Sequence, residues 1–206
     1  MRGSGGNVSS SRSGRTSHRR ARGQGLVEFA LVAPLLIGLA FGIFDFGRGM
    51  SANITVTNSS REGARYLATQ ASTLSSPYGT TCPTGTTAPT GTSAQSKAWN
   101  QMLGASLDMT RVTLLTVYFY KSSNDPSADT ARTAYDKTVS CNLSGGAFTG
   151  SSTVTAGSNT GDSSYVPQTG DWVQFRVQYQ YTTATPIIHQ LVATVTVDQT
   201  TTMVLE

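Results

Sequence analysis

Hydrophobic residues are concentrated in one stretch near the start of the chain, from Leu26 to Phe46. As a helix, these 21 residues rise about 30 Å, which is the thickness of the hydrocarbon core of a bilayer. The part without any charge, residues 29–44, has 16 residues, which is short for a classical membrane span but long for the apolar core of a signal peptide. The pattern therefore predicts a helix that spans a membrane once.

Two acidic residues flank the uncharged part of this stretch. Asp45 lies at its outer end near Arg48, where we expect water to reach the carboxylate. Glu28 lies near the opposite boundary, where a carboxylate costs less than at the bilayer centre. Either Glu28 simply reaches the interface, or it has a specific partner.

The same helix is expected to continue beyond the apolar stretch, because no strong helix breaker occurs between Asn53 and Gln70. It then has about 45 residues and a length of roughly 65–70 Å. Gly38 and Gly42 form a G-x-x-x-G pattern within it. This pattern indicates either a close-packed helix–helix face or only the frequency of glycine in membrane helices.

Further along the chain, the apolar positions change to the period of strands. Residues Asp171–Thr182 are predicted to form a strand, in which the nine positions 173–181 alternate between apolar and polar side chains, as is typical of a half-buried antiparallel strand. Arg111–Lys121 is rich in β-branched and aromatic residues and is predicted to be a buried strand, and Ala193–Leu205 to be a last one. In the strand predicted over 171–182, the apolar side chains on one face are those of Val173, Phe175, Val177, Tyr179 and Tyr181.

Polar segments separate these elements. Residues 71–96 and 144–170 are rich in Ser, Thr and Gly and are predicted to be loops. At the end of the first loop, Ser93 is a candidate cap for an amphipathic helix through about Asp108, which would bury Ala98, Met102 and Ala105.

Charge orients the chain. Residues 1–22 contain no acid and six arginines, whereas the remaining residues carry 9 basic and 11 acidic side chains. An arginine-rich flank stays in the cytoplasm, so the rest of the chain is expected outside the cytoplasmic membrane. The basic character belongs to the arm alone, so nucleic-acid binding by the body is not expected. The arginines are Arg2, Arg12, Arg15, Arg19, Arg20 and Arg22.

The predicted fold class is therefore α+β, a long N-terminal transmembrane helix that continues into a small extracytoplasmic domain with an antiparallel sheet. The expected parts are listed by residue range: a basic, disordered cytoplasmic leader (1–23), a transmembrane helix (24–47), its extracytoplasmic continuation (48–70) and an extracytoplasmic α+β domain (71–206).

Both cysteines, Cys82 and Cys141, lie in segments predicted to be loops outside the membrane, where disulfides persist. A bridge between them would close a loop of about 60 residues and contribute about 3–4 kcal/mol in the chain-entropy description. The alternatives are two free thiols or pairing with another chain.

The start of the apolar stretch has the order of a processing signal. A basic leader ends at Gly23, Gln24 follows, and Glu28 is the fifth residue after the glycine. This order resembles the type IV prepilin class of signal, which is cut before its hydrophobic segment. The resemblance implies cleavage between Gly23 and Gln24 by a prepilin peptidase, and a pairing of Glu28 with the α-amine of a neighbouring subunit in a fibre.

A closer resemblance covers residues 22–68. The blocks GQGLVEFALVAPLL (23–36), FDFGR (44–48) and REGARY (61–66) look like the N-terminal region of TadE/TadG-like proteins. These are minor pilins or pseudopilins of the tight-adherence (Flp) pilus system. The resemblance implies a pilin-like fold, and as partners it implies the membrane, a prepilin peptidase and other pilins of that system.

No motif of an enzyme accompanies these features. The chain lacks H-E-x-x-H, G-x-S-x-G and a P-loop, and His189 has no acid or nucleophile at a fixed spacing. With two histidines and two cysteines, a four-ligand zinc site is not expected. We expect no catalysis, cofactor, metal or small-molecule substrate.

The leading hypothesis is a minor pilin of a Tad-type pilus, which acts in assembly or at the fibre tip. The alternatives are a permanently anchored envelope protein that never enters a fibre, and a secreted hydrolase with an ordinary signal peptide.

Overall fold

The computed structural model describes residues 19–69, 93–128, 133–141, 143–145, 147–148, 153–157, 165–185, 189–190 and 192–206. These divide into two units, Met1–Ile43 and Phe44–Glu206, which are considered separately below.

One helix, α1 (Arg19–Ala68), contributes residues to both units. It has 50 residues and passes through Pro34 without interruption. A proline removes one backbone hydrogen bond, and membrane helices tolerate this loss. The prediction that the helix continues far beyond the apolar stretch, to about residue 70, is confirmed.

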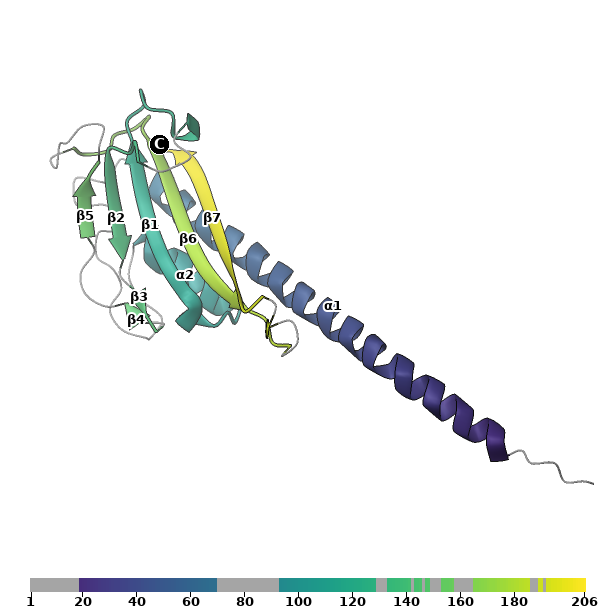
Figure 1. Cartoon of the computed structure of the whole chain (residues 1–206). Coiled ribbons are helices and arrows are strands. Elements are labelled where there is room, and N and C mark those ends of the chain that lie inside the picture. The colour runs from purple at the N-terminus through teal and green to yellow at the C-terminus, as the bar shows by residue number, and fades with distance from the viewer. Residues whose placement is uncertain are drawn as a thin grey trace, which may run out of the picture. The chain divides into compact units, whose positions relative to one another are not determined.

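The second unit contains a five-stranded sheet in which every neighbouring pair is antiparallel (Figure 1). A separate two-stranded hairpin joins β3 (Leu143–Ser144) to β4 (Ala147–Phe148). The α+β fold class is therefore confirmed. In spatial order, the sheet consists of β5 (Thr153–Ala156), β2 (Lys137–Cys141), β1 (Val112–Tyr120), β6 (Trp172–Thr182) and β7 (Thr194–Val204).

The alternation predicted for β6 decides which face of the sheet is buried. Its apolar side chains are buried, from 0% exposed at Val173 to 8% at Tyr181, and they join one hydrophobic core. Within the second unit, α1 adds Ala52, Val56 and Leu67 to the same core. The outer part of the helix therefore packs on the apolar face of the sheet, as expected.

A second helix, α2 (Ala94–Gly104), begins at the predicted cap, because the Ser93 hydroxyl accepts a hydrogen bond from the Ser96 amide. Ala98 and Met102 are buried as predicted. The predicted end at Asp108 and the burial of Ala105 are wrong. Ser106 has a φ of 57°, in the left-handed region, and this turn stops the helix before Ala105 can face the core.

Short helical turns complete the connections. The 3₁₀ turn η2 (Met109–Arg111) is capped by Asp108 and leads into β1, and η3 (Pro126–Ala128) follows that strand.

The prediction of loops around Cys141 and through 144–170 is also wrong. Cys141 ends β2 and is 2% exposed, while β4 and β5 occupy part of the second segment. These strands have two to five residues, too few for a period to emerge from a Thr- and Ser-rich sequence. Cys141 is not a free thiol. Cys82 lies outside the described residues, so the Cys82–Cys141 pairing stays a prediction.

Candidate functional site: the exposed apolar helix and its anchorage

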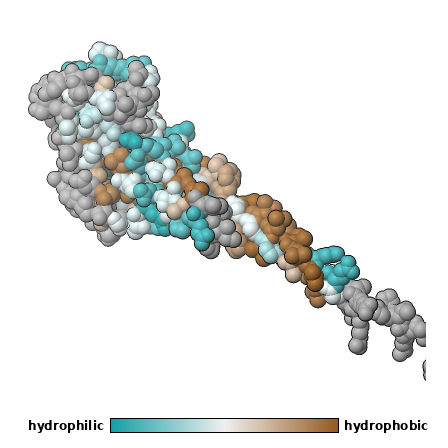
Figure 2. All heavy atoms as spheres, viewed as in Figure 1, coloured by the Kyte–Doolittle hydropathy of each residue, from teal (hydrophilic) through white to brown (hydrophobic). Residues whose placement is uncertain are grey.

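The described part of the first unit is an apolar helix surface without protein cover. Its large side chains point outward on every side of the helix and are 49–75% exposed. Figure 2 shows them as a continuous brown surface along this part of α1. Globular proteins rarely expose apolar patches of more than a few hundred Å². The exposed side chains are Leu26, Val27, Phe29, Leu31, Val32, Leu35, Leu36, Ile37, Leu39, Phe41 and Ile43.

By length and composition, Gly23–Ala68 is the one helix among the described residues that qualifies as a membrane span. From Gln24 to Ile43, the exposed apolar part has 20 residues, and a helix of that length rises about 30 Å. An apolar helix of this kind is consistent with single-pass anchoring in a membrane.

The predicted cleavage site lies at the beginning of this surface. Gly23, Gln24 and Glu28 all belong to α1 and are exposed. Gln24 and Glu28 are four residues apart, so they share a face of the helix, one turn from each other. Because this bond lies in the second turn of α1, a protease that cuts between Gly23 and Gln24 would have to unwind the start of the helix. The cleavage and the pairing of Glu28 stay predictions.

Gly38 and Gly42 lie on this surface, and a Cβ atom added at either position would meet no neighbouring atom within 4 Å. The fold of this chain therefore does not itself require glycine at these positions. Their predicted part in packing against another helix concerns a second molecule and stays a prediction.

Where the second unit begins, a carboxylate joins α1 to the end of β6. Asp45 accepts hydrogen bonds from the Ala184 amide at 3.1 Å and the Thr185 amide at 3.0 Å, one on each oxygen. Its own carbonyl accepts a hydrogen bond from the Tyr181 hydroxyl at 3.0 Å. We call these four residues the Asp45 clasp.

The expectation that water reaches Asp45 is wrong, because this residue is 4% exposed. The chain that leaves β6 covers the carboxylate and supplies two amide donors in place of water. Arg48, one turn further along α1, lies over the rings of Phe44 and Tyr181 at 5.8 Å from each ring centre.

Polar and small residues complete the contact between α1 and the sheet. The Gln199 side chain donates to Asn53 at 2.9 Å, and the hydroxyls of Ser60 and Thr201 are 2.7 Å apart. At Gly63 an added Cβ would lie 2.9 Å from the ring of Phe175. This close approach explains why glycine is needed here, where any side chain would push the helix from the sheet.

Residues 23–65 match the protein family described as TadE-like. This segment, about a fifth of the chain, is TadE-like. No match was found among the curated proteins or the solved structures with which it was compared. The matched segment begins at the predicted cleavage site and includes the exposed apolar helix, Asp45 and Gly63. The resemblance predicted over 22–68 is thereby confirmed. TadE-like proteins belong to the context of the Tad pilus and are generally structural rather than enzymatic.

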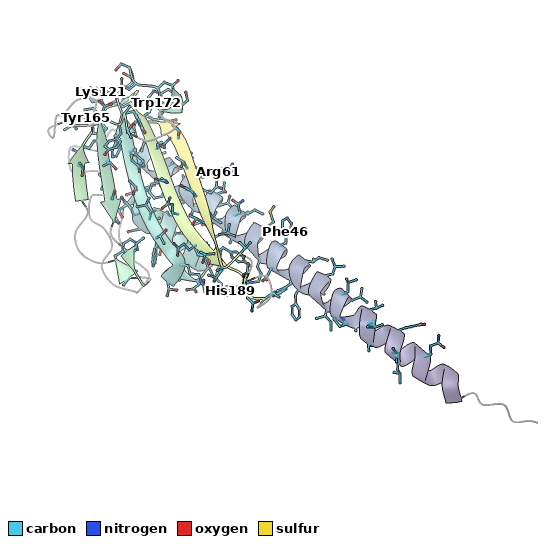
Figure 3. All side chains as sticks on the ribbon, in the orientation of Figure 1. Phe46, Arg61, Lys121, Tyr165, Trp172 and His189 are labelled. Atoms are coloured by element: carbon cyan, nitrogen blue, oxygen red, sulfur yellow. The ribbon has the colours of Figure 1, made fainter. Side chains whose placement is uncertain are left out.

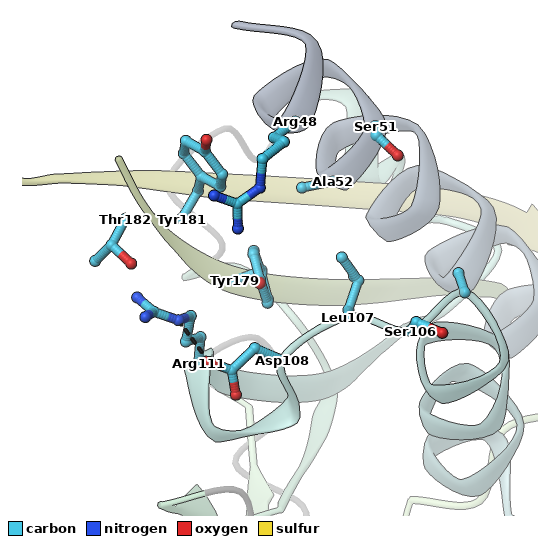
Figure 4. Close-up of a pocket in the computed structure, with 11 residues that line it drawn as sticks. Arg48, Ser51, Ala52, Ser106, Leu107, Asp108, Arg111, Tyr179, Tyr181 and Thr182 are labelled. Atoms are coloured by element: carbon cyan, nitrogen blue, oxygen red, sulfur yellow. Dashed lines mark hydrogen bonds and ion pairs between the residues drawn. The ribbon is translucent and has the colours of Figure 1, made fainter. Parts of the chain in front are cut away.

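A pocket of about 270 Å³ opens beside the Asp45 clasp, between α1, η2 and the end of β6 (Figure 4). Arg48 and Arg111 enter it from different elements. Asp108 binds the Nε atom of Arg111 at 2.7 Å. The hydroxyl of Thr110, and then Arg111, hold the pKa of Asp108 below its usual range.

His189 lies on the segment after β6 and is exposed (Figure 3). Its backbone amide donates a hydrogen bond to the Thr185 carbonyl at 2.8 Å. Glu62 and Arg65, in the matched segment, form an exposed ion pair at 2.8 Å. In the folded protein this pair lowers the pKa of Glu62, chiefly through the hydrogen bond from Arg65.

Sequence reasoning missed the Asp45 clasp and the two-arginine pocket. The partners of Asp45 follow it by 139 and 140 residues. The hydrophobic periodicity of a sequence predicts local structure and cannot predict a contact between residues so far apart in the chain. The sequence does contain a signal for the contact between α1 and the sheet. Small residues recur on one face of the helix at Ala52, Ser59 and Gly63, and this spacing lets a helix approach a sheet closely.

Proposed function

We propose that this TadE-like protein is a minor pilin or pseudopilin of a Tad-type pilus. It is inserted in the cytoplasmic membrane with the N-terminus inside, is cut after Gly23, and acts in assembly or at the fibre tip. The observation that carries the proposal is the exposed apolar helix, which lies inside the matched segment and starts at the cleavage motif.

In this proposal, the apolar helix and the sheet domain have different roles. The apolar helix provides lateral packing, first with lipid and then with neighbouring subunits, and Gly38 and Gly42 permit close approach. Glu28 sets the register by pairing with the α-amine of Gln24 of a neighbour. The sheet domain remains outside and presents a specific surface.

The alternative is an envelope protein that stays anchored and never enters a fibre. It shares the apolar helix, so the helix alone does not separate the two. Processing does, because only a pilin precursor is a substrate of a prepilin peptidase.

The mature N-terminus tests the proposal. The full chain is produced in cells with and without a prepilin peptidase, and its terminus is read by mass spectrometry. A start at Gln24 that depends on the peptidase supports the pilin, whereas an uncut arm in both strains supports the permanent anchor. A start beyond about residue 42 would mean secretion.

A pair of glycine variants supplies the matched control. Gly23→Val and Gly47→Val both place a side chain where no neighbour lies within 4 Å, so neither creates a clash within the fold. Gly23→Val is expected to stop cleavage, because the branched side chain enters the protease cleft. Gly47→Val is expected to be cut normally.

A further inference from the structure

The pocket beside the Asp45 clasp collects hydrogen-bond donors. Three elements build it: α1 supplies Arg48, the turn after α2 and η2 supply Ser106 and Arg111, and β6 supplies Thr182 at its end. Figure 4 shows both guanidinium groups reaching into the same space. Two arginines from segments far apart in sequence thus line a cavity of about 270 Å³.

The acid in the pocket neutralises only one of these arginines. Asp108 uses one oxygen for Nε of Arg111 and the other for the Thr110 amide and hydroxyl. The two Nη groups of Arg111 have no partner among the described residues.

Arg48 makes no direct ion pair within the described part of the chain; it has its ring contacts and a longer-range attraction to the carboxylate of Asp45. The residues that line the pocket therefore carry one net positive charge. The carboxylate of Asp45 lies next to the pocket, but its two oxygens already accept hydrogen bonds from the Ala184 and Thr185 amides, so the guanidinium N–H donors of Arg48 remain uncommitted among the described residues.

Guanidinium groups bind phosphate through paired, charge-assisted hydrogen bonds. The hydroxyl groups of Ser106 and Thr182, which also line the pocket, are further hydrogen-bond donors. We propose that this pocket binds the phosphate of an anionic phospholipid headgroup.

The position along the helix favours a lipid over a dissolved phosphate. Arg48 follows Ile43, the last residue of the apolar unit, by five residues, a rise of about 7–8 Å. The headgroup layer on each side of a bilayer is roughly 5–8 Å thick. Basic pockets beside membrane helices bind anionic headgroups on the cytoplasmic or matrix side of membranes. The proposal extends the same chemistry to the outer side, where the proposed topology places this pocket. This step rests on the proposed span of residues 24–43.

The test uses the full chain in nanodiscs of phosphatidylcholine alone or of phosphatidylcholine mixed with phosphatidylglycerol. Amide hydrogen exchange of residues 105–111 and 182–185 is measured by mass spectrometry. A bound headgroup suppresses local opening, so exchange in the mixed discs is expected to be about tenfold slower. Equal exchange in the two kinds of disc would overturn the proposal.

Four variants locate the effect. Arg48→Gln and Arg111→Gln are expected to lose the slowing, whereas Arg61→Gln keeps it, because Arg61 is exposed on the same helix outside the pocket. Asp108→Asn removes the only acid of the pocket and retains an oxygen to cap η2, so it is expected to increase the slowing. A variant that merely misfolds does not produce this gain. Loss in Asp108→Asn would contradict the charge argument.

Two further measurements test whether the bound phosphate comes from a lipid or from solution, and whether the chain inserts in the bilayer at all. Slowing in phosphatidylcholine discs on addition of inorganic phosphate, without slowing by phosphatidylglycerol, would overturn the lipid as ligand. Co-elution of the chain with the discs is measured independently of exchange. A chain that does not co-elute contradicts the proposed span, and the headgroup site then falls with it.

Discussion

At the scale of single residues, the chain depends on a few polar groups placed next to apolar surface. Asp45 is the clearest example, because it is buried at the end of a run of apolar side chains. Its carboxylate accepts hydrogen bonds from two backbone amides, and its carbonyl accepts one from a tyrosine hydroxyl. Glu28 is its counterpart at the other end, where it is exposed and has no partner among the residues that the structure describes. One acid is used within the fold, and the other is available to a second molecule.

Replacing Asp45 with Ala is expected to lower the free energy of unfolding by about 2 kcal/mol, because the buried Thr185 amide loses its acceptor. Urea unfolding of the full chain in detergent, followed by the fluorescence of Trp99 and Trp172, measures the change. Asp125→Ala is the matched control, since Asp125 accepts one amide in an exposed loop and should cost no more than about 0.5 kcal/mol. An equal loss of unfolding free energy in the two variants would contradict the stabilising role of the Asp45 clasp.

Tyr181 makes stability fall at high pH. Burial, and then the charge of Asp45, raise the pKa of Tyr181 above its usual value near 10. Above about pH 10 the unfolded chain ionises this phenol while the folded chain keeps it neutral, so stability falls as pH rises. Tyr181→Phe is expected to cost about 1 kcal/mol at neutral pH through the lost hydrogen bond and to flatten this fall. An unchanged slope would contradict the assignment.

Glu28→Ala is expected to leave membrane insertion intact and to reduce incorporation into pili. The reason is the loss of the carboxylate that pairs with a neighbouring α-amine. Glu62→Ala, on the same helix, is the control and should assemble normally, because Glu62 pairs with Arg65 of its own chain. Immunoblots of sheared pili and of membranes measure both properties. Normal assembly of Glu28→Ala would end the register hypothesis.

At the scale of elements, the long ones followed from the sequence and the short ones did not. The helix α1 and the strands β1, β6 and β7 have nine residues or more, enough for a period to appear. The shorter strands β2, β4 and β5 depend on neighbours for their pairing, and the end of α2 depends on one left-handed residue. Trp99, packed 4.5 Å from Phe148, was missed because its partner lies in such a strand.

The contact of α1 with the sheet predicts a sharp response at Gly63. In Gly63→Ala the new methyl group lies 2.9 Å from the fully buried ring of Phe175, so the helix or the ring must shift. We expect a loss of about 1–3 kcal/mol in the free energy of unfolding. Gly47→Ala, on the same helix without a neighbour, is expected to gain up to about 1 kcal/mol from helix propensity. Urea unfolding distinguishes the two, and a gain in both would show that the close approach is absent.

At the scale of the whole molecule, the apolar unit and the sheet domain have different kinds of surface. Residues 24–43 have the length and exposure of a membrane span, while the sheet domain has a single core and a polar outer face. The family match extends across the boundary between the two units, from residue 23 to residue 65. The matched segment therefore includes both the exposed apolar helix and the helix surface on which the sheet packs.

The distribution of amines allows one measurement of the central claim, that the helix spans the membrane with the sheet domain outside. All three lysines, Lys97, Lys121 and Lys137, lie in the sheet domain. Intact cells are treated with a membrane-impermeant, amine-reactive reagent, and the protein from carbonate-washed membranes is analysed by mass spectrometry. Our account predicts a chain that begins at Gln24, with an unlabelled α-amine and with label on Lys97 and Lys121, which are partly exposed. A labelled α-amine with unlabelled lysines, or a soluble chain without residues 24–43, would contradict it.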